Sequence, residues 1–562
     1  MSAVNVYLGG DCFRRFREED RLYVDKTPLI EELLTPDRPL VSVITRPRRF
    51  GKTLAMSMLE EFFSRQKQSA SYFEGLAVAK NSELCSAWMN KYPVLSLSLK
   101  EIKDLDFARA LANFSHSLSE LCYANAFLLQ SDSLDHDLQA KISLLKSGSA
   151  EKHDLIYSLR LLSQALHSYY GLPTIILIDA YDVPLHYAKV NGYYPEMVDF
   201  LGNMFSAAFK TNDSLEFAVL TGCLRIAKES IFTGLNNFVC YGLDDKKFSD
   251  AFGFTDEEVE EILKKANLLE KKKIIKEWYD GYIFGRDKDI YCPWDINYYV
   301  YEALQEAKAE PKLYWINTSS NSIVTHFLEK SDVDLREKFE KLLNGGSVET
   351  RLVETTHYDL SKSSEEEIFS LLYATGYLTR ARHEQKAGKS ADQAELVLPN
   401  KEIREVFLKE VKDWLLASLQ NMDRTALFAA FWRGDALAWS RLVSSLLLKS
   451  ISYYGYHEDY YHAFLAGLFA GTGVRVRKNI ESGEGRADIL LRDPEHGRAA
   501  CLEVKLAESS ERLHGRAEEA LAQIAAKRYA AELREEYPTI LSWGVSFWKK
   551  SCFACVRSIN EA

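Results

Sequence analysis

The chain has 562 residues, too many for one ordinary hydrophobic core, so two to four domains are expected. Hydrophobic residues make up 47 % and charged residues 27 % of the sequence, as in globular proteins, and the lack of a long apolar run excludes a membrane-spanning helix. The net charge of −11 excludes a surface that is basic throughout, so a groove for nucleic acid has to come from local clusters of Lys and Arg.

The first informative feature is a phosphate-binding loop. Residues 40–44 are a compact apolar run, which predicts a buried strand, and an apolar pattern with helical spacing begins after Thr53. Between the two stands Gly51-Lys52-Thr53, and this order is the context of a Walker A motif. Backbone N–H groups would hold phosphate oxygens, Lys52 would reach the terminal phosphates, and Thr53 would bind Mg²⁺.

The loop departs from the usual pattern at its first position. Arg46 stands in place of the first Gly, which leaves a non-functional loop as the alternative. Together with Arg48 and Arg49, however, it concentrates positive charge at the phosphate site. The sequence therefore predicts ATP binding by Arg46, Arg48, Arg49, Phe50, Gly51, Lys52 and Thr53.

A second apolar strand, residues 174–178, ends in Asp179, which is the Walker B arrangement. We expect Asp179 to hold Mg²⁺ through a water molecule. Apolar runs at residues 93–97 and 217–220 predict two further strands of a P-loop sheet.

Two polar residues follow the last of these strands. Thr221 at its end is a sensor-like polar group. Arg225 can contact the γ-phosphate of its own subunit or reach a neighbour in a homo-oligomer, and a plain structural role is the equal alternative.

The middle of the chain is less informative. Thr255 and the acidic residues after it predict a helix N-cap. The aromatic-rich run from Tyr291 to Tyr301 is expected to pack in a core, with stacking on nucleobases as the alternative. Two runs at 377–380 and 396–400 flank a polar segment and predict a hairpin, and a mostly helical segment follows.

The segment from Gly485 to Lys505 has the pattern of a metal-dependent nuclease site. Two apolar runs flank a turn-rich stretch, which predicts a β-hairpin. Side chains alternate along a strand, so Glu503 and Lys505 share one face and Asp488 lies on the neighbouring strand. The two carboxylates can share a hard cation such as Mg²⁺ or Mn²⁺, and Lys505 can orient the attacking water and neutralise charge on a phosphate. A solvated surface hairpin is the alternative.

Cys552 and Cys555 form a C-x-x-C pair near the C-terminus. Because there is no second pair and the context is strand-like, core packing is expected rather than zinc binding. The nine cysteines lack the spacing of a disulfide framework, and the N-terminus has no signal-peptide pattern. We therefore expect reduced thiols in the cytoplasm.

Taken together, these features resemble the AAA-ATPase-like bacterial proteins that carry a small PD-(D/E)XK nuclease domain at the C-terminus. The resemblance covers nearly the whole chain. It rests on the Arg-rich loop before Lys52, on Tyr23-Val-Asp-Lys-Thr27, on an aromatic turn at 278–295, and on Asp488 with Glu503-Val-Lys505.

The resemblance implies three further roles. Glu458 would supply another acidic group to the nuclease site, and Gln523 would supply an amide from a helix. The aromatic turn would be a lid on the nucleotide domain. The chemistry of the Tyr23–Thr27 run is not derivable from the sequence, and the run can simply dock the N-terminal helix.

The resemblance also implies a Glu directly after Asp179, as the group that activates the hydrolytic water. Ala180 stands there, and its methyl group cannot polarise water, so we expect ATP to be bound and hydrolysed poorly. Two origins stay open: natural loss of hydrolysis, or an engineered substitution that traps the ATP state, which the intact remainder of the motif favours. Asp182 could be a partial substitute.

The expected fold is α/β: a P-loop AAA-like ATPase domain at 1–245, a helical lid and connector with a hairpin at 246–425, and a PD-(D/E)XK, restriction-endonuclease-like domain at 426–562. The expected activity is ATP-controlled, metal-dependent cleavage of nucleic acid, with DNA favoured, and the domain pairing points to defence against foreign DNA. The alternative is a nucleotide-switched DNA-binding or scaffold protein with a vestigial nuclease site. The expected catalytic residues are Asp488, Glu503, Lys505, Glu458 and Gln523, and the expected metal ligands are Asp488, Glu503, Thr53 and Asp179.

Overall fold

The structure is a computed structural model of the chain. It describes residues 4–225, 231, 237–285, 287–306, 308–315, 333–353, 364–382, 392–420, 424–449, 458–469, 474–482, 485–529 and 532–559. The chain divides into two compact units, one of residues 1–319 and 347–403 and the other of residues 320–346 and 404–562. The predicted region 246–425 is thus shared between the units, and the predicted boundaries at 245 and 425 stay a prediction.

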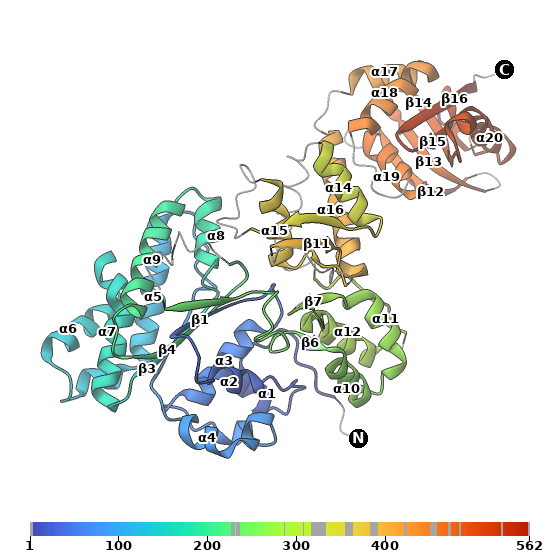
Figure 1. Cartoon of the computed structure of the whole chain (residues 1–562). Helices are drawn as coiled ribbons and strands as arrows, with labels where there is room; N and C mark the ends of the chain where they lie inside the picture. Colours follow the sequence, from blue (N-terminus) through green and yellow to red (C-terminus); the bar gives the residue numbers. More distant parts are fainter. Residues whose placement is uncertain are drawn as a thin grey trace. The chain divides into compact units, whose positions relative to one another are not determined.

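A five-stranded parallel sheet with strand order β2-β3-β4-β1-β5 is the centre of the first unit (Figure 1). Both of its faces are covered, which explains why its central strands read as continuous apolar runs. The four strands that the sequence predicts are confirmed. The strands are β1 (Val41–Thr45), β2 (Val94–Ser98), β3 (Thr174–Asp179), β4 (Leu215–Gly222) and β5 (Phe238–Tyr241).

Helices pack on both faces of this sheet. Helix α3 (Lys52–Phe63) follows the phosphate loop and buries Met58, Leu59, Phe62 and Phe63, as its apolar spacing predicts. The remaining helices of this part are α1 (Phe13–Glu18), α2 (Pro28–Leu33), α4 (Ser82–Trp88), α5 (Phe107–Ala124), α6 (His136–Lys146), α7 (Lys152–Tyr170), α8 (Val183–Val190) and α9 (Tyr194–Phe209).

The lid region has its own small core. It consists of α10 (Asp256–Ala266), α11 (Lys272–Tyr279), α12 (Pro293–Gln305) and a three-stranded sheet of β6 (Phe254–Thr255), β8 (Lys288–Tyr291) and β7 (Tyr282–Phe284). Thr255 is the N-cap of α10, where its hydroxyl accepts from the Glu258 N–H and the Glu258 carboxylate accepts from the Thr255 N–H. The predicted cap is confirmed.

The predicted hairpin of 377–400 belongs to a second three-stranded sheet. Strands β10 (Thr379–Arg380) and β11 (Gln393–Val397) pair antiparallel, and β9 (Val348–Arg351) pairs with β11. The tip of the hairpin, residues 383–391, lies outside the described residues. Helix α15 (Glu365–Thr375) precedes this hairpin.

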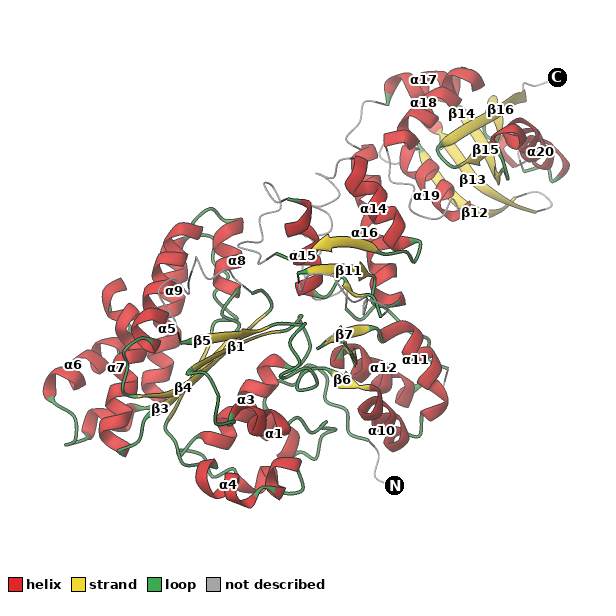
Figure 2. Ribbon diagram, in the orientation of Figure 1, coloured by secondary structure: helices red, strands yellow, loops and turns green. Residues whose placement is uncertain are grey.

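The C-terminal domain of the second unit has a mixed five-stranded sheet in the order β12-β13-β14-β15-β16 (Figure 2). Strands β14 and β15 run parallel, and the other pairs are antiparallel. The strands are β12 (Arg475–Ser482), β13 (Gly485–Asp493), β14 (Arg498–Leu506), β15 (Thr539–Trp548) and β16 (Ser551–Ile559). The helices of the second unit are α14 (Val333–Leu343), α16 (Lys401–Gln420, which begins in the first unit), α17 (Thr425–Trp432), α18 (Ala436–Lys449), α19 (Glu458–Phe469) and α20 (Leu513–Ala526).

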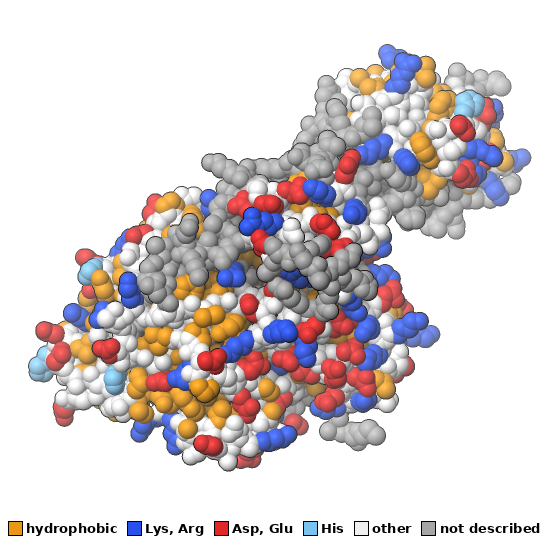
Figure 3. All heavy atoms as spheres, viewed as in Figure 1, with side chains coloured by type: hydrophobic (Ala, Val, Ile, Leu, Met, Phe, Trp, Pro, Cys, Tyr) orange, Lys and Arg blue, Asp and Glu red, His pale blue; other side chains and the backbone are white. Residues whose placement is uncertain are grey.

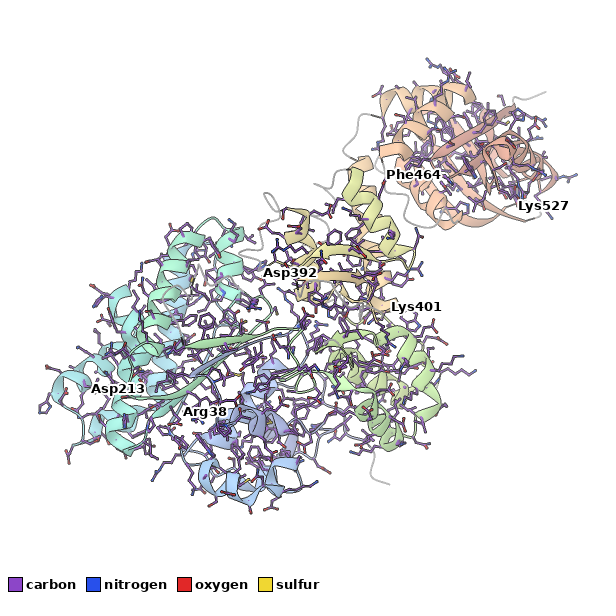
Figure 4. The ribbon with its side chains drawn as sticks, in the orientation of Figure 1. Arg38, Asp213, Asp392, Lys401, Phe464 and Lys527 are labelled. Carbon is purple, nitrogen blue, oxygen red and sulfur yellow. The ribbon has the colours of Figure 1, made fainter. Side chains whose placement is uncertain are left out.

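Two separate cores cover the two faces of this sheet. Phe464 of α19, labelled in Figure 4, packs with residues of α17 and α18 against one face. Ile524 of α20 packs against the other face. Alternate residues of β14 divide between the two cores: Leu502 and Val504 belong to the first, and Cys501 belongs to the second.

Gly544 of β15 allows α20 to lie directly on the sheet. A side chain built at Gly544 would collide with the backbone of Ala517 and Leu521 in α20. Gly544 is the register partner of Glu503 on β14, so this close approach brings α20 over the predicted nuclease residues.

Gly544→Val should therefore destabilise the C-terminal domain by about 1–3 kcal/mol, because overpacking moves the helix off the sheet. The matched control is Gly515→Ala in the same helix, where the added methyl group meets open space and should leave stability unchanged or raise it by about 0.5–1 kcal/mol. Denaturant unfolding of the full chain measures both. Equal stabilities of the two variants would contradict the close approach.

Surface properties agree with the composition. Acidic and basic side chains are interspersed on the face drawn in Figure 3. Within the described ranges, no helix is both long enough and apolar enough to span a membrane. The nine cysteines are all free, and Cys552 is buried in the core.

Candidate functional site

The predicted nuclease hairpin is formed by β13 and β14, which are joined by a turn at Pro494–His496. The two strands pair in register from Asp493 and Arg498 to Ile489 and Leu502. One residue further, the Asp488 carboxylate takes the place of a backbone acceptor, because its Oδ2 accepts from the Val504 N–H at 2.8 Å. Asp488 is therefore fixed to the neighbouring strand, as the sequence predicts.

Glu503 and Lys505 lie on the face of β14 that α20 covers, and Gln523 of α20 connects them. The Gln523 amide donates to Glu503 Oε1, and its oxygen accepts from Lys505 Nζ at 2.8 Å. Glu503 is buried at 4 % exposure, whereas Lys505 is only partly buried. Glu503, Lys505 and Gln523 therefore lie in contact with one another, as the sequence predicts.

His462 of α19 also belongs to this site, although the sequence did not predict a role for it. Its Nε2 lies 3.4 Å from Asp488 Oδ2. The signal was present in the sequence, because His462 follows Glu458 by four residues and side chains at this spacing share one helix face. Glu458 is the first residue of α19, but its side chain lies outside the described residues, so its predicted role stays a prediction.

The carboxylates of Glu503 and Asp488 both lie near the buried Cys501 thiol. Burial raises the pKa of the Cys501 thiol, and the negative charges of Glu503 and Asp488 raise it further. Two carboxylates held by neutral donors beside one ammonium group are a donor set that fits a hard divalent cation. Among the described side chains, no group of three His, Cys, Asp or Glu residues has the arrangement of a complete metal site.

The phosphate loop joins β1 to α3 with the geometry of an anion site. Gly51 is the N-cap of α3 with a φ of 87°, a left-handed conformation that favours glycine. The first N–H groups of a helix have no partner within the helix and can bind phosphate. Lys52 Nζ donates to the carbonyls of Arg46 and Pro47 at 2.9 and 2.7 Å, so its ammonium group lies across the loop.

Three residues that the sequence predicts for a Mg²⁺ and sensor site lie together at the carboxyl edge of the sheet. The buried Asp179 accepts from the Thr53 hydroxyl at 2.8 Å and from the Thr221 hydroxyl at 2.7 Å. A hydroxyl and a carboxylate in contact at the start of α3 fit a Mg²⁺ ion that accompanies bound phosphate.

Arg46 is placed differently from the prediction. Its side chain is fully buried, and its guanidinium donates to the carbonyls of Thr45, Tyr241, Gly242 and Phe248 at 2.7–3.2 Å. Burial lowers its pKa to about 10, so it stays charged at neutral pH. The direct phosphate contact expected of Arg46 is not what the structure shows, because these carbonyls occupy the guanidinium.

The other loop residues surround the start of α3. Arg49 lines a cavity together with Phe50, Gly51 and Lys52, and its guanidinium lies 4.0 Å from the centre of the Trp294 ring. Arg48 lies near His186, because its charge contributes to lowering the pKa of that imidazole to about 4, although burial is the larger cause. Phosphate contacts of Arg48 and Arg49 stay a prediction.

The turn after the Walker B strand has two unusual residues. Ala180 has a φ of 57°, in the left-handed region that residues with a side chain rarely adopt. Asp182 is buried, and its Oδ2 accepts from the N–H groups of Cys223 and Leu224 at 2.9 and 3.2 Å. This use of Asp182 as a cap on the end of β4 does not favour it as a substitute base.

Arg225 is exposed and lines a cavity of about 350 Å³ at the carboxyl edge of the sheet, next to Thr45 and Gly242. The neighbouring residues 226–230 lie outside the described part of the chain. The predicted choice between a γ-phosphate contact and a structural role therefore stays open.

A buried carboxyl pair lies close to Arg49. Asp295 of α12 and Glu402 of α16 are joined by a hydrogen bond, and Glu402 Oε1 also accepts from the Trp315 N–H at 2.7 Å. Burial raises the pKa of both groups, and the charge of Asp295 raises that of Glu402 further. One proton is therefore held in the folded state at a pH at which unfolded carboxyl groups have lost theirs.

This pair should make the first unit less stable as pH rises. The folded-state pKa of Glu402 is raised, so its favourable contribution is complete below the ordinary value of 4.5 and is lost as pH rises towards the folded value. The slope approaches about 1.4 kcal/mol per pH unit for one proton. Glu402→Gln, which keeps a neutral hydrogen-bonding group, should flatten the decline between pH 5 and pH 9 in calorimetry of the full chain. The exposed control Glu101→Gln should keep the wild-type slope, and a wild-type slope in Glu402→Gln would contradict the shared proton.

Comparison with known proteins agrees with the geometry of both the phosphate loop and the C-terminal hairpin. Residues 8–232 match the family model described as a predicted AAA-ATPase, and residues 456–557 match that of the PD-(D/E)XK nuclease superfamily. The chain therefore contains an AAA-ATPase-like domain at residues 8–232 and a PD-(D/E)XK nuclease superfamily domain at residues 456–557, and the α/β fold expected from the sequence is confirmed.

One relative matches this chain over nearly the full length of both proteins. The chain is 25 % identical over 579 residues to an uncharacterized protein in the vnfD 5′ region of Azotobacter chroococcum mcd 1, and the match covers 98 % of each chain. The description of that protein names no activity. The two domains by themselves indicate an ATPase-linked nuclease that uses a nucleotide, a divalent metal and a nucleic acid.

Proposed function

We propose that this protein is a nucleotide-controlled, Mg²⁺-dependent nuclease that cleaves DNA and acts in defence against foreign DNA. The observation that carries the proposal is the hydrogen-bonded series Glu503–Gln523–Lys505 beside Asp488. DNA is proposed over RNA, and defence over other roles, on the family resemblance and the domain pairing.

The site residues have separable roles in this reaction. Asp488 and Glu503 would hold the metal ion, which when bound lowers the pKa of a water molecule and polarises the phosphodiester. Gln523 keeps Glu503 and Lys505 in fixed positions through its two hydrogen bonds. The partly buried Lys505 ammonium group can neutralise the charge that develops on the phosphate. His462 supports Asp488 from α19.

Local positive charge beside the site supports a nucleic acid as the substrate. Val476 of β12 packs with the core of α17–α19, so Arg475 and Arg477 project from the opposite face of the strand. Arg477 is the register partner of Leu490, which packs in the core below α20. Both exposed arginines are therefore on the face of the sheet that carries Glu503, where they can bind phosphates of a long substrate.

The first unit supports nucleotide binding and gives a reason for slow hydrolysis. Lys52, Thr53 and Asp179 supply the cation and the metal ligands that phosphate binding needs. Ala180 offers no carboxylate to orient a water molecule, and Asp182 is occupied by backbone N–H groups. We therefore propose that the chain as written binds Mg-ATP and retains it.

Glu503→Gln and Lys505→Met should each lower metal-dependent cleavage by at least about 10²-fold, because groups that position or activate water typically contribute 10²–10⁴-fold. Cleavage of labelled single- and double-stranded DNA and RNA with Mg²⁺ or Mn²⁺ measures this, and EDTA should abolish it. The controls are Glu495→Gln on the exposed turn of the same hairpin and Lys527→Met after α20, which should keep wild-type activity.

Two outcomes would count against this assignment. Full activity in Glu503→Gln and Lys505→Met would place the chemistry elsewhere. If the wild-type chain binds DNA but cuts none of the substrates with either metal, a nucleotide-switched DNA-binding protein with a vestigial site is the better description.

Ala180→Glu should raise the rate of ATP hydrolysis by about 10²–10⁴-fold, since it restores a carboxylate after Asp179. The backbone at this position is already left-handed for a residue with a side chain, so no new backbone strain is expected. Phosphate release under steady-state conditions is the measurement, and Ala79→Glu, at an exposed site outside the phosphate loop, is the control. Unchanged turnover in Ala180→Glu would show that another group already acts as the base.

A further inference from the structure

A cavity of about 300 Å³ continues from the phosphate loop into the first unit. Its lining includes Gly51, Lys52 and Thr53, the residues that end the loop and begin α3. A ligand whose phosphates bind at the start of α3 would therefore have the rest of its structure in this cavity. The volume is at the lower end of the roughly 300–1,000 Å³ of small-molecule sites.

The walls of the cavity are aromatic. Phe16 and Tyr23 come from the N-terminal segment, and Trp294 comes from α12 of the lid. The Trp294 ring is held in place by three contacts: its Nε1 donates to the Tyr314 carbonyl at 3.2 Å, the Arg49 guanidinium lies 4.0 Å from its centre, and the Tyr298 ring packs on it with a centroid distance of 4.7 Å. Flat apolar rings in fixed orientations suit a nucleobase, because every base has a π-face that stacks on an aromatic side chain.

The Tyr23–Thr27 run builds one side of this cavity, which gives the run a role. Tyr23 is partly buried, and its hydroxyl donates to the sulfur of Met58 in α3. Lys26 fixes the run to the lid, because its ammonium group bonds both the Glu258 carboxylate and the Asp250 carbonyl at 2.7 Å. Asp25 fixes it from the other side by accepting from the Ala77 N–H at 2.6 Å.

One amide in the lining can read the edge of a base. Asn297 lies one helical turn after Trp294 on α12 and also lines the cavity. Within the described part of the chain, its amide group makes no hydrogen bond, so it can both donate and accept. An Asn amide matches the adjacent donor and acceptor of adenine.

We propose that this cavity is the base site of the nucleotide: the rings of Phe16, Tyr23 and Trp294 pack around an adenine ring, and Asn297 determines specificity at its edge. The inference rests on the proposed binding of phosphate at Lys52 and adds the part of the ligand that the P-loop does not recognise. It also makes the lid a component of nucleotide recognition, since Trp294 contacts Arg49 of the loop and the base at once.

The test compares ligands that share phosphates and differ in the base. Binding of Mg-ATP, Mg-CTP and Mg-tripolyphosphate to the full chain is measured by calorimetry. ATP should bind at least about ten-fold more tightly than the other two, since stacking and edge contacts add to the phosphate interaction. Trp294→Ala should lose this preference and keep the wild-type affinity for tripolyphosphate. Asn297→Leu should lower the ratio of ATP to CTP affinity.

Trp278→Ala is the matched control, because Trp278 belongs to the same lid, lies under Lys401 and does not line the cavity. It should bind ATP as the wild-type chain does. If tripolyphosphate binds as tightly as ATP to the wild-type chain, or if Trp294→Ala keeps the preference for ATP, the base site is wrong while phosphate binding stands. If no ligand binds the wild-type chain, the proposed nucleotide function fails as well.

A second measurement covers the case in which Trp294→Ala does not fold. Photocrosslinking of the wild-type chain with 8-azidoadenosine triphosphate should label peptides that contain Tyr23 or Trp294, and excess ATP should suppress the labelling. Labelling of peptides outside the cavity alone would overturn the proposal.

Discussion

One buried cation determines the shape of the phosphate loop. The Arg46 guanidinium is withdrawn from water and surrounded by carbonyl oxygens from the end of β1, the end of β5 and the segment that leads to the lid. Burial of a charge is costly unless hydrogen bonds compensate it, and here both terminal nitrogens of the guanidinium donate to carbonyls, whereas the buried Nε has no hydrogen-bond partner among the described residues. Where other phosphate loops begin with a glycine that leaves room, this loop begins with a side chain that ties three segments together. One part of the wall of the cavity beside the loop, Ala251, Gly253 and Phe254, follows directly after the segment that Arg46 holds through the Phe248 carbonyl.

The C-terminal domain follows a different rule, the period of two along a strand. Alternate residues of β14 serve the two cores, and the same alternation places Glu503 and Lys505 below α20. The helix can approach closely only because the neighbouring strand has Gly544 at the same level. The apolar packing of the sheet and α20 therefore determines where Glu503 and Lys505 lie. No separate loop is needed to hold these two residues in place. The two domains thus use contrasting means, a cation inside a loop and side-chain alternation in a sheet.

The sequence allowed most of the elements to be predicted, for reasons that differ between them. The parallel strands were recognisable because burial on both faces makes them continuous apolar runs, and the nuclease hairpin was recognisable from turn residues between two such runs. The position of Arg46 was not predictable, because a charged residue at a glycine position reads as a surface group unless its carbonyl partners, which are distant in sequence, are known. The Asp295–Glu402 pair was not predictable for the same reason, because its two members are distant in sequence. His462 could have been found from its spacing to Glu458, whereas the part of Glu458 itself stays a prediction.

The hydrogen bond from the Val504 N–H to Asp488 affects the order in which site residues would be replaced if the nuclease activity were lost in evolution. Asp488 serves the backbone of its own sheet as well as any metal, so its replacement would leave a strand donor without an acceptor. Lys505 makes its hydrogen bond to a side chain and has part of its surface in water, so its loss costs the fold less. A lineage released from selection for cleavage would then lose the lysine first and keep the aspartate as a structural residue. Among relatives, an intact aspartate would therefore say little about activity, and the lysine would be the more informative residue.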